Sequence, residues 1–229
     1  MLLLTGIVVV FIANIILGIF VYLNDPSKIY NRYFALLCLS LSLWSGFNYL
    51  ADYQLSNTLI WTRMTFFTIS YALLFLILFL NLFPRRLIKN VYFSYIAILS
   101  AVVTSVITLL PSFVPGVEIK DGVSNVLTGP LYYVFLVYFA VFFIALVCLV
   151  VLSWRKSSGQ DRIKLKYLMM GVLAMAVLAS VSNLILPLLL GSNEYAKYGT
   201  LATLIFVAFT AYSIIRHSLF DIRSVVARS

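Results

Sequence analysis

The chain has 229 residues, of which 63% are hydrophobic and only 10% are charged. This composition excludes an ordinary soluble domain, in which about half of the residues are apolar and about a quarter are charged. The formal net charge is +9, but the basic residues form no patch interleaved with aromatic residues on a soluble face, which disfavours a nucleic-acid partner.

Seven apolar stretches follow one another, and each is about as long as a bilayer is thick. A helix rises about 1.5 Å per residue, so about 20 apolar residues cross a hydrocarbon core of about 30 Å. The stretches cover roughly residues 3–23, 32–51, 61–83, 91–111, 130–153, 164–190 and 198–216. We therefore predict an all-α membrane protein, a bundle of seven transmembrane helices joined mostly by short loops. No Lys or Arg precedes the first stretch, as a cleaved signal peptide would require, so we expect it to be retained.

The basic residues are sorted by loop. Thirteen of the 16 Lys and Arg residues lie in or beside the connections between stretches one and two, three and four, and five and six, or at and after the end of the last stretch. The other side of the predicted membrane has only Arg63, Lys120 and Lys197. Because short loops rich in Lys and Arg stay in the cytoplasm, we expect the N-terminus outside and the C-terminus in the cytoplasm.

The longest outer loop runs roughly from Ser112 to Gly129. Val117 and Ile119 alternate with polar residues, and Asp121-Gly122 precedes Val123. An Asp-Gly pair between alternating apolar residues is typical of a β-hairpin. The sequence predicts a small hairpin over the outer ends of the helices, with an irregular loop as the alternative.

Small and polar residues indicate which helix faces look inward. In the sixth stretch Ala176, Ala179, Ser180 and Asn183 fall on one face. Helix packing is the ordinary explanation, because small residues let backbones approach and polar side chains hydrogen-bond across an interface. The alternative is an outward-facing cavity between helices two, three, five, six and seven. Its candidate ligand-binding residues are Asn48, Asp52, Arg63, Tyr138 and Asn183.

Arg63 lies about one turn inside the outer end of the third stretch. An Arg at this depth can extend to the membrane surface as a plain surface charge. Alternatively, it pairs with Asp52 or binds an anionic group of a ligand. The hydroxyl of Tyr138, which lies deeper, needs a hydrogen-bond partner. We expect Pro187 to kink the outer end of the sixth helix or to free a backbone carbonyl.

Residues that could carry chemistry are missing from the helix centres. None of the seven acidic residues lies in mid-membrane, and the single histidine, His217, sits at the cytoplasmic end of the seventh stretch. No His, Cys, Asp or Glu cluster has metal-ligand spacing, and no Ser or Cys has a visible base partner. We therefore expect no catalytic residue, no metal site and no cofactor. Retinal is disfavoured because the last stretch has no Lys for a Schiff base.

The last helix is predicted to continue beyond the membrane. Its apolar residues are spaced like a heptad seam, and no Gly or Pro follows Thr200. We expect one unbroken helix at least to about Val225, pairing with a second copy in a coiled coil; an amphipathic segment on the membrane surface is the alternative. The predicted signal-transmission residues are Ile215, Leu219, Ile222 and Val226.

These features resemble the N-terminal seven-helix region of bacterial and archaeal sensor histidine kinases, which also precedes diguanylate cyclase domains. The resemblance covers essentially the whole chain and depends on short motifs in a fixed order. They are Trp44, Trp61-Thr62-Arg63, Phe83-Pro84-Arg85, Gly129-Pro130-Leu131-Tyr132, the basic loop GQDRIKLKYLMMG, Asn183 with Pro187, and AYSIIRHSLFDIR after the seventh helix.

The resemblance implies a sensory input domain in a two-component-type receptor of a prokaryotic cytoplasmic membrane. Residues 1–216 would form the sensor, and residues 217–229 would begin a signalling helix. A kinase or cyclase output domain would lie outside this chain, which ends at Ser229. The implied partners are the bilayer, a second copy of the receptor, and a ligand that is a small molecule, a peptide or a lipid. The alternative function is a stand-alone passive carrier or membrane scaffold without an output domain.

Overall fold

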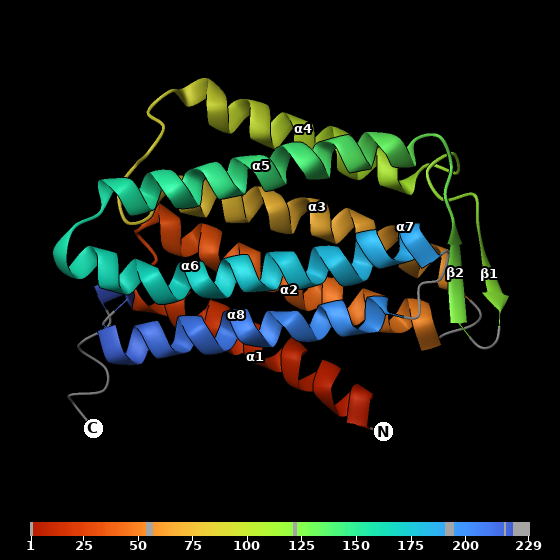
Figure 1. Ribbon diagram of the computed structural model, residues 1–229, viewed down its shortest axis with the longest axis horizontal. Coiled ribbons are helices and arrows are strands. Elements are labelled where there is room, and N and C mark those ends of the chain that lie inside the picture. The colour runs from red at the N-terminus through yellow and green to blue at the C-terminus, as the bar shows by residue number, and fades with distance from the viewer. Residues whose placement is uncertain (1, 54–56, 121–122, 191–194, 218, 222–229) are drawn as a thin grey trace.

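Long helices run side by side along the longest axis of the molecule (Figure 1). The computed structural model describes residues 2–53, 57–120, 123–190, 195–217 and 219–221. The first four helices are α1 (Leu2–Asn24), α2 (Ile29–Tyr53), α3 (Thr58–Leu82) and α4 (Val91–Leu109). They are followed by a hairpin of β1 (Gly116–Lys120) and β2 (Val123–Leu127) and by α5 (Tyr132–Lys156). The chain then continues through α6 (Gly159–Ser180), a π-helical segment (Val181–Ile185), α7 (Leu186–Leu190), α8 (Ala196–His217) and a 3₁₀ turn (Leu219–Asp221).

Within the described residues, seven helical segments are long and apolar enough to cross a membrane. One of them runs from Asp161 to Leu190 and joins α6, the π-helical segment and α7. Large apolar side chains such as Ile16, Leu99 and Ile144 are mostly exposed on the outside of the bundle. This surface suits lipid, in which apolar side chains need no cover. The predicted all-α seven-helix bundle is confirmed.

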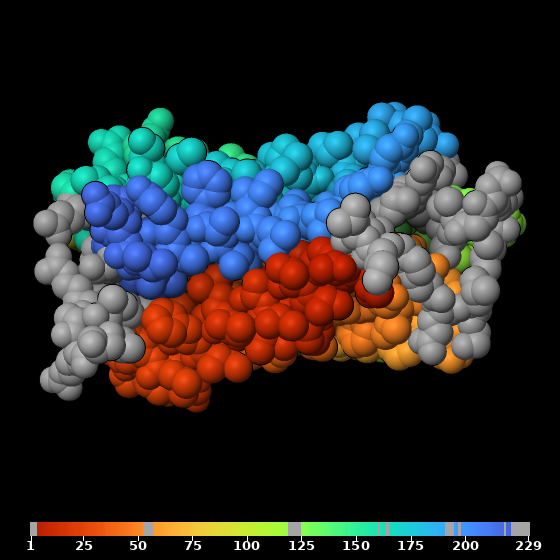
Figure 2. Space-filling view, turned by 90° about the horizontal axis from the view of Figure 1, so that it is seen from below, coloured from red at the N-terminus to blue at the C-terminus, as the bar shows by residue number. Residues whose placement is uncertain are grey.

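The packing order places α3 at the centre of the bundle. It contacts α2, α4 and α5, while α8 contacts α6, α1 and α2. Figure 2 shows α8 lying along α1 on one face of the molecule, with α6 beyond it. In contrast, α5 and α6 touch only sparsely, although a short connection joins them. The packing between α5 and α6 is therefore sparse.

The two ends of the bundle differ. The connections 25–28, 83–90 and 157–158, which hold or adjoin most of the basic residues, lie at the end where the last helix finishes (Figure 1). The hairpin lies at the other end, together with the start of α1. Strands β1 and β2 are antiparallel, with Gly116 opposite Leu127 and Lys120 opposite Val123. The predicted hairpin is confirmed, and its two connecting residues, 121 and 122, lie outside the described residues.

The predicted kink near Pro187 takes the form of the π-helical segment one turn before it. A proline has no N–H and its ring clashes with the carbonyl four residues earlier, here that of Asn183. A π turn adds a residue and so separates these groups. The backbone N–H of Leu186 accordingly donates to the carbonyl of Val181, five residues earlier.

Candidate functional site

A cavity of about 130 Å³ lies between α2, α3, α5, α6 and α8, in the half of the bundle beneath the hairpin. Its deepest walls are apolar, and Val126 of β2 also contributes to the lining. The polar side chains lie mainly toward the hairpin end. The deep apolar residues include Leu41, Leu76, Leu146 and Met175, and the polar ones are Asn48, Asp52, Thr62, Thr65, Ser180, Asn183 and Thr203.

Three of the five candidate ligand residues line this cavity: Asn48, Asp52 and Asn183. They come from α2 and from the π-helical segment after α6, which are far apart in sequence. The other two candidates, Arg63 and Tyr138, do not line it. The structure thus brings the two Asn residues and Asp52 together at the cavity, whereas Arg63 and Tyr138 form hydrogen bonds elsewhere.

The amide of Asn48 is the most informative polar group in the cavity. Its side chain is only 9% exposed. Its nitrogen, Nδ2, is buried and has no hydrogen-bond acceptor among the described residues. A buried donor without a partner costs about 1–3 kcal/mol. Among the described residues, this part of the cavity wall therefore contains a buried donor that no protein acceptor satisfies.

Asn183 is held in place by its own helix. Its amide nitrogen donates to the carbonyl of Ala179 at 3.0 Å and to the hydroxyl of Ser182 at 3.1 Å. Gly199 of α8 lies directly against this amide, so closely that a Cβ atom at position 199 would overlap it. The π-helical segment therefore forms a fixed wall of the cavity, and the absence of a side chain at Gly199 lets α8 close against it.

Arg63 ties α3 to the loop that precedes the hairpin. Its Nε and Nη2 both donate to the backbone carbonyl of Val114, at 3.2 Å and 2.7 Å. Val114 is fully buried beside Phe113, where a carbonyl needs a donor. In this structure Arg63 therefore has a structural role at the outer end of the bundle, and its predicted contact with an anionic ligand stays a prediction.

Tyr138 joins α5 to α3. Its hydroxyl donates to the backbone carbonyl of Ser70 at 2.8 Å, and both residues are buried. The hydroxyl of Ser70 is itself engaged, because it donates to the carbonyl of Phe66. The partner that the Tyr138 hydroxyl requires at this depth is thus a backbone group of α3 and not a ligand in the cavity.

The sequence analysis placed the third helix at the cavity only through Arg63 and did not name the residues of α3 that line it. These residues are Thr62, Thr65, Phe66, Ile69, Leu73 and Leu76. Apart from Thr65, which precedes Phe66 directly, they follow one another at intervals of three or four residues, as expected for one face of a helix. That periodicity is visible in the sequence, but apolar residues surround it on the other faces of α3, so the pattern did not distinguish a cavity from ordinary packing.

The exit of the last helix differs from the prediction. Helix α8 ends at His217, and Phe220 adopts a left-handed conformation with φ of 62°. Leu219 and Phe220 are 0% and 1% exposed, whereas Ile215 is 80% exposed. The predicted unbroken helix is therefore wrong, and Ile215 and Leu219 do not share one exposed seam. The other two predicted transmission residues, Ile222 and Val226, lie outside the described residues.

Phe220 is inserted into an aromatic cluster at the end of the bundle opposite the hairpin. Its ring centroid lies 5.0 Å from that of Phe34, 5.1 Å from that of Phe83 and 6.0 Å from that of Phe79. Tyr30 stacks on it at 6.4 Å. The chain after α8 thus turns back onto α2 and α3, and we call residues Leu219–Asp221 in this position the docked exit.

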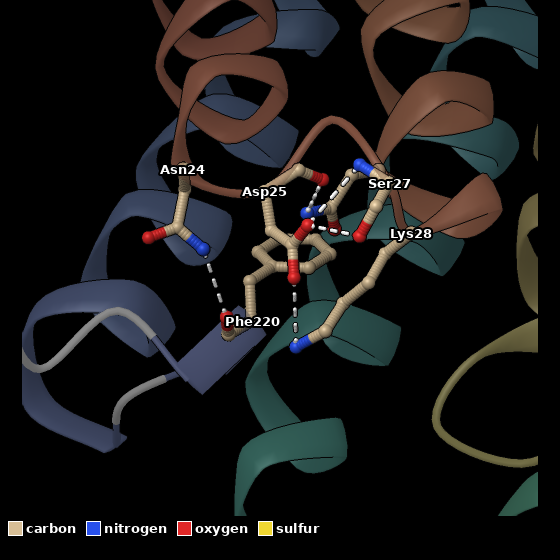
Figure 3. Close-up of polar contacts among 6 residues, drawn as sticks. Asn24, Asp25, Ser27, Lys28 and Phe220 are labelled. Atoms are coloured by element: carbon tan, nitrogen blue, oxygen red, sulfur yellow. Dashed lines mark hydrogen bonds and ion pairs between the residues drawn. The ribbon is translucent and has the colours of Figure 1, made fainter.

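The end of α1 and the connection between α1 and α2 lie against the docked exit (Figure 3). Asn24 donates from Nδ2 to the carbonyl of Phe220 at 3.2 Å. Beside it, the carboxylate of Asp25 accepts hydrogen bonds from the hydroxyl and the backbone N–H of Ser27 and forms an ion pair with Lys28 at 3.6 Å. The hydrogen bond from the Ser27 hydroxyl is the main cause that lowers the pKa of Asp25 below its ordinary value. These contacts stabilise the turn at residues 25–28, next to the hydrogen bond between Asn24 and Phe220.

A family model, the N-terminal seven-transmembrane region of histidine kinase, matches residues 6–223. The chain belongs to this family. Its match spans all seven helices and the docked exit. No curated protein and no solved structure matches the chain.

Membership identifies the chain as a multi-pass membrane domain of the sensor type, which is an input region and not a catalytic one. The described residues contain no group of three or more His, Cys, Asp or Glu side chains that could hold a metal.

Proposed function

We propose that this chain is the sensory input domain of a histidine kinase, which senses the occupancy of the cavity and passes the result to an output domain through the exit of α8. The observation that carries the proposal is that the same helices line the cavity and hold Phe220. Phe34 lies seven residues from Leu41 along α2, which corresponds to about 10 Å. On α3, Phe79 lies three residues beyond Leu76.

Helix α8 makes the same connection from its own side. Thr203 lines the cavity, and Phe206, nearly one turn further on, packs on Phe34 with centroids 5.9 Å apart. Packed cores respond to a local shift by moving between discrete arrangements, because they are too dense to deform continuously. A change in how α2, α3 and α8 pack around the cavity would therefore alter the site that receives Phe220.

The proposed switch has two states. In the docked state Phe220 is buried and α8 ends at His217. In the released state the exit leaves the bundle and α8 continues as a helix, which no Gly or Pro after Thr200 prevents. Ile215, Leu219, Ile222 and Val226 would then form one seam and pair with the same seam of a second copy in a parallel coiled coil.

This proposal includes the orientation. The N-terminus would be outside a prokaryotic cytoplasmic membrane and the docked exit in the cytoplasm, on the strength of the loops that carry the basic residues. A stand-alone carrier or scaffold would place no requirement on the exit of α8. The docked exit supports the sensor over the carrier or scaffold. Phe220, in the segment after α8, packs against α2 and α3, which also line the cavity.

The test joins residues 1–229 to the dimerisation and catalytic domains of a histidine kinase and measures autophosphorylation in membrane vesicles. The variant Phe220→Ala removes the ring that fills the aromatic cluster, while Ile144→Ala truncates an exposed residue on the outer face of α5. We expect several-fold altered autophosphorylation in Phe220→Ala and an unchanged rate in Ile144→Ala. Equal rates in both variants and the parent would overturn the proposed transmission and favour the carrier or scaffold.

A further inference from the structure

The charges of the residues that line the cavity restrict the kind of molecule that can bind there. Among its described lining residues only Asp52 is formally charged, and none is Lys, Arg or His. Arg63, the cation that the sequence analysis proposed for the cavity, donates instead to the carbonyl of Val114. Among the described lining residues, an anionic group would therefore meet a carboxylate and apolar walls and no positive charge, which is strongly unfavourable.

Asn48 defines the polar end of the occupant. Asn48 lines the cavity, and its buried Nδ2 is a donor without an acceptor among the described residues. A ligand oxygen that accepts this hydrogen bond would satisfy it, whereas an ammonium or another pure donor would not. The occupant should therefore present a carbonyl, ether or hydroxyl oxygen at the level of Asn48.

The rest of the cavity defines an apolar tail. From Asn48 the lining continues seven residues along α2 to Leu41, which is about 10 Å deeper. At that depth the walls are Leu76, Leu146 and Met175. The volume of about 130 Å³ is close to that of an engineered apolar cavity of about 150 Å³ that binds benzene. The site accommodates one slender chain or ring and not a two-chain lipid.

The cavity has a side wall from which such a molecule could enter. Its lining residues Phe139 and Phe143 on α5 and Ala176 and Ala179 on α6 are only partly buried. These two helices contact each other sparsely. A molecule dissolved in the bilayer would thus reach the cavity between α5 and α6.

We infer that the cavity binds a neutral, single-chain amphiphile, whose oxygen accepts the hydrogen bond from Asn48 and whose apolar chain extends toward Leu41. This inference rests on the proposed function only in treating that molecule as the signal. Binding itself is a property of the seven-helix chain and is measured without any kinase domain.

The experiment uses the whole 229-residue chain in lipid nanodiscs and a photoreactive diazirine analogue of octanol. We expect mass spectrometry to find the label on α2 between Leu41 and Asn48 or on the facing part of α5. Octanol should compete for labelling, while octanoate and octylamine of equal chain length should not. Competition by octanoate or octylamine as strong as that by octanol would overturn the neutral assignment, and labelling only on lipid-facing residues would overturn the site.

Two pairs of variants complete the test. Asn48→Leu keeps the branched side-chain shape but removes the donor, and we expect it to bind octanol roughly fivefold more weakly. Asn57→Leu, at an exposed position before α3, should bind normally. Ala179→Phe should abolish labelling by filling the cavity, whereas Ala140→Phe, on the exposed face of α5, should not. If Asn48→Leu and Ala179→Phe bind as their controls do, the inference is wrong even where the kinase chimera responds to Phe220→Ala.

Discussion

Replacing Gly199 with Ala tests how closely α8 packs against the cavity wall. An added Cβ atom would lie 2.5 Å from the hydroxyl oxygen of Ser182 and 2.9 Å from Cγ of Asn183, and closer still to the Asn183 amide nitrogen. Neither neighbour is free to move, because Ser182 donates to the carbonyl of Leu178 and Asn183 donates to that of Ala179. The extra methyl group must therefore push the helices apart or break a hydrogen bond.

The magnitude follows from opposing effects. Overpacking in a well-packed interior costs about 1–3 kcal/mol, and loss of a hydrogen bond costs about 0.5–1.5 kcal/mol. The gain from replacing a helical Gly with Ala is about 0.5–1 kcal/mol. We therefore expect Gly199→Ala to lower the free energy of unfolding by about 2 kcal/mol, which for a domain of this size lowers Tm by roughly 4–8 °C.

The matched control is Gly46→Ala, in the interior of α2. A Cβ atom there would meet only the ring of Phe11, at 3.5 Å, which is ordinary van der Waals contact. This variant should be as stable as the parent or more stable by about 0.5–1 kcal/mol. Thermal unfolding of both variants in the same detergent gives the comparison. Equal Tm values for Gly199→Ala and Gly46→Ala would refute the close packing of α8 on the π-helical segment.

Three further results are expected. Arg63→Gln should lower the free energy of unfolding by about 1.5–3 kcal/mol through loss of a charged hydrogen-bond donor, with Arg63→Lys intermediate; equal thermal stability of all three proteins would contradict the tether at the outer end. A cysteine at Ser158 should react with an impermeant thiol reagent only after cells are opened, and one at Asn57 should react in intact cells; the reverse pattern would invert the orientation. Asp25→Asn should leave stability near neutral pH unchanged within the error of the measurement, because this exposed pair is screened by solvent. Since the pKa of Asp25 is lowered in the fold, its small contribution is present above the ordinary carboxyl range and is lost as the pH falls through it; a loss of stability on raising the pH that depends on Asp25 would contradict this sign.

The helices and the hairpin were predictable because their signals are local. Each span needs only a sufficient run of apolar residues, and the hairpin between Gly116 and Leu127 needs only alternation around a turn pair. The inward position of Asn48 and Asn183 was also predictable, since polar amides at membrane depth avoid lipid. The local pattern did not reveal that Asn48 would lack a protein acceptor, because that depends on every neighbour at once.

The partners of Arg63 and Phe220 could not be predicted from the sequence. Arg63 binds a backbone carbonyl, Phe220 packs on aromatic rings, and in each case the partner lies far away along the chain. The acceptor of Arg63 is the backbone carbonyl of Val114. Every residue has such a carbonyl, so the sequence does not indicate which one Arg63 contacts. The end of α8 at His217 has no Gly or Pro to signal it, and a left-handed Phe220 is uncommon. Burial of Phe220 among the rings of α2 and α3 stabilises that conformation, so the termination of α8 is set by tertiary packing.

The central claim is that the cavity and the docked exit are coupled, and filling the cavity tests it without knowledge of the ligand. The measurement is autophosphorylation of the kinase chimera in vesicles, with Ala179→Phe compared with Ala140→Phe. The account predicts that Ala179→Phe alters the rate several-fold, because its ring occupies the space between α2, α3 and α8, and that Ala140→Phe leaves the rate unchanged. A chimera that responds to Phe220→Ala but not to Ala179→Phe would contradict the coupling.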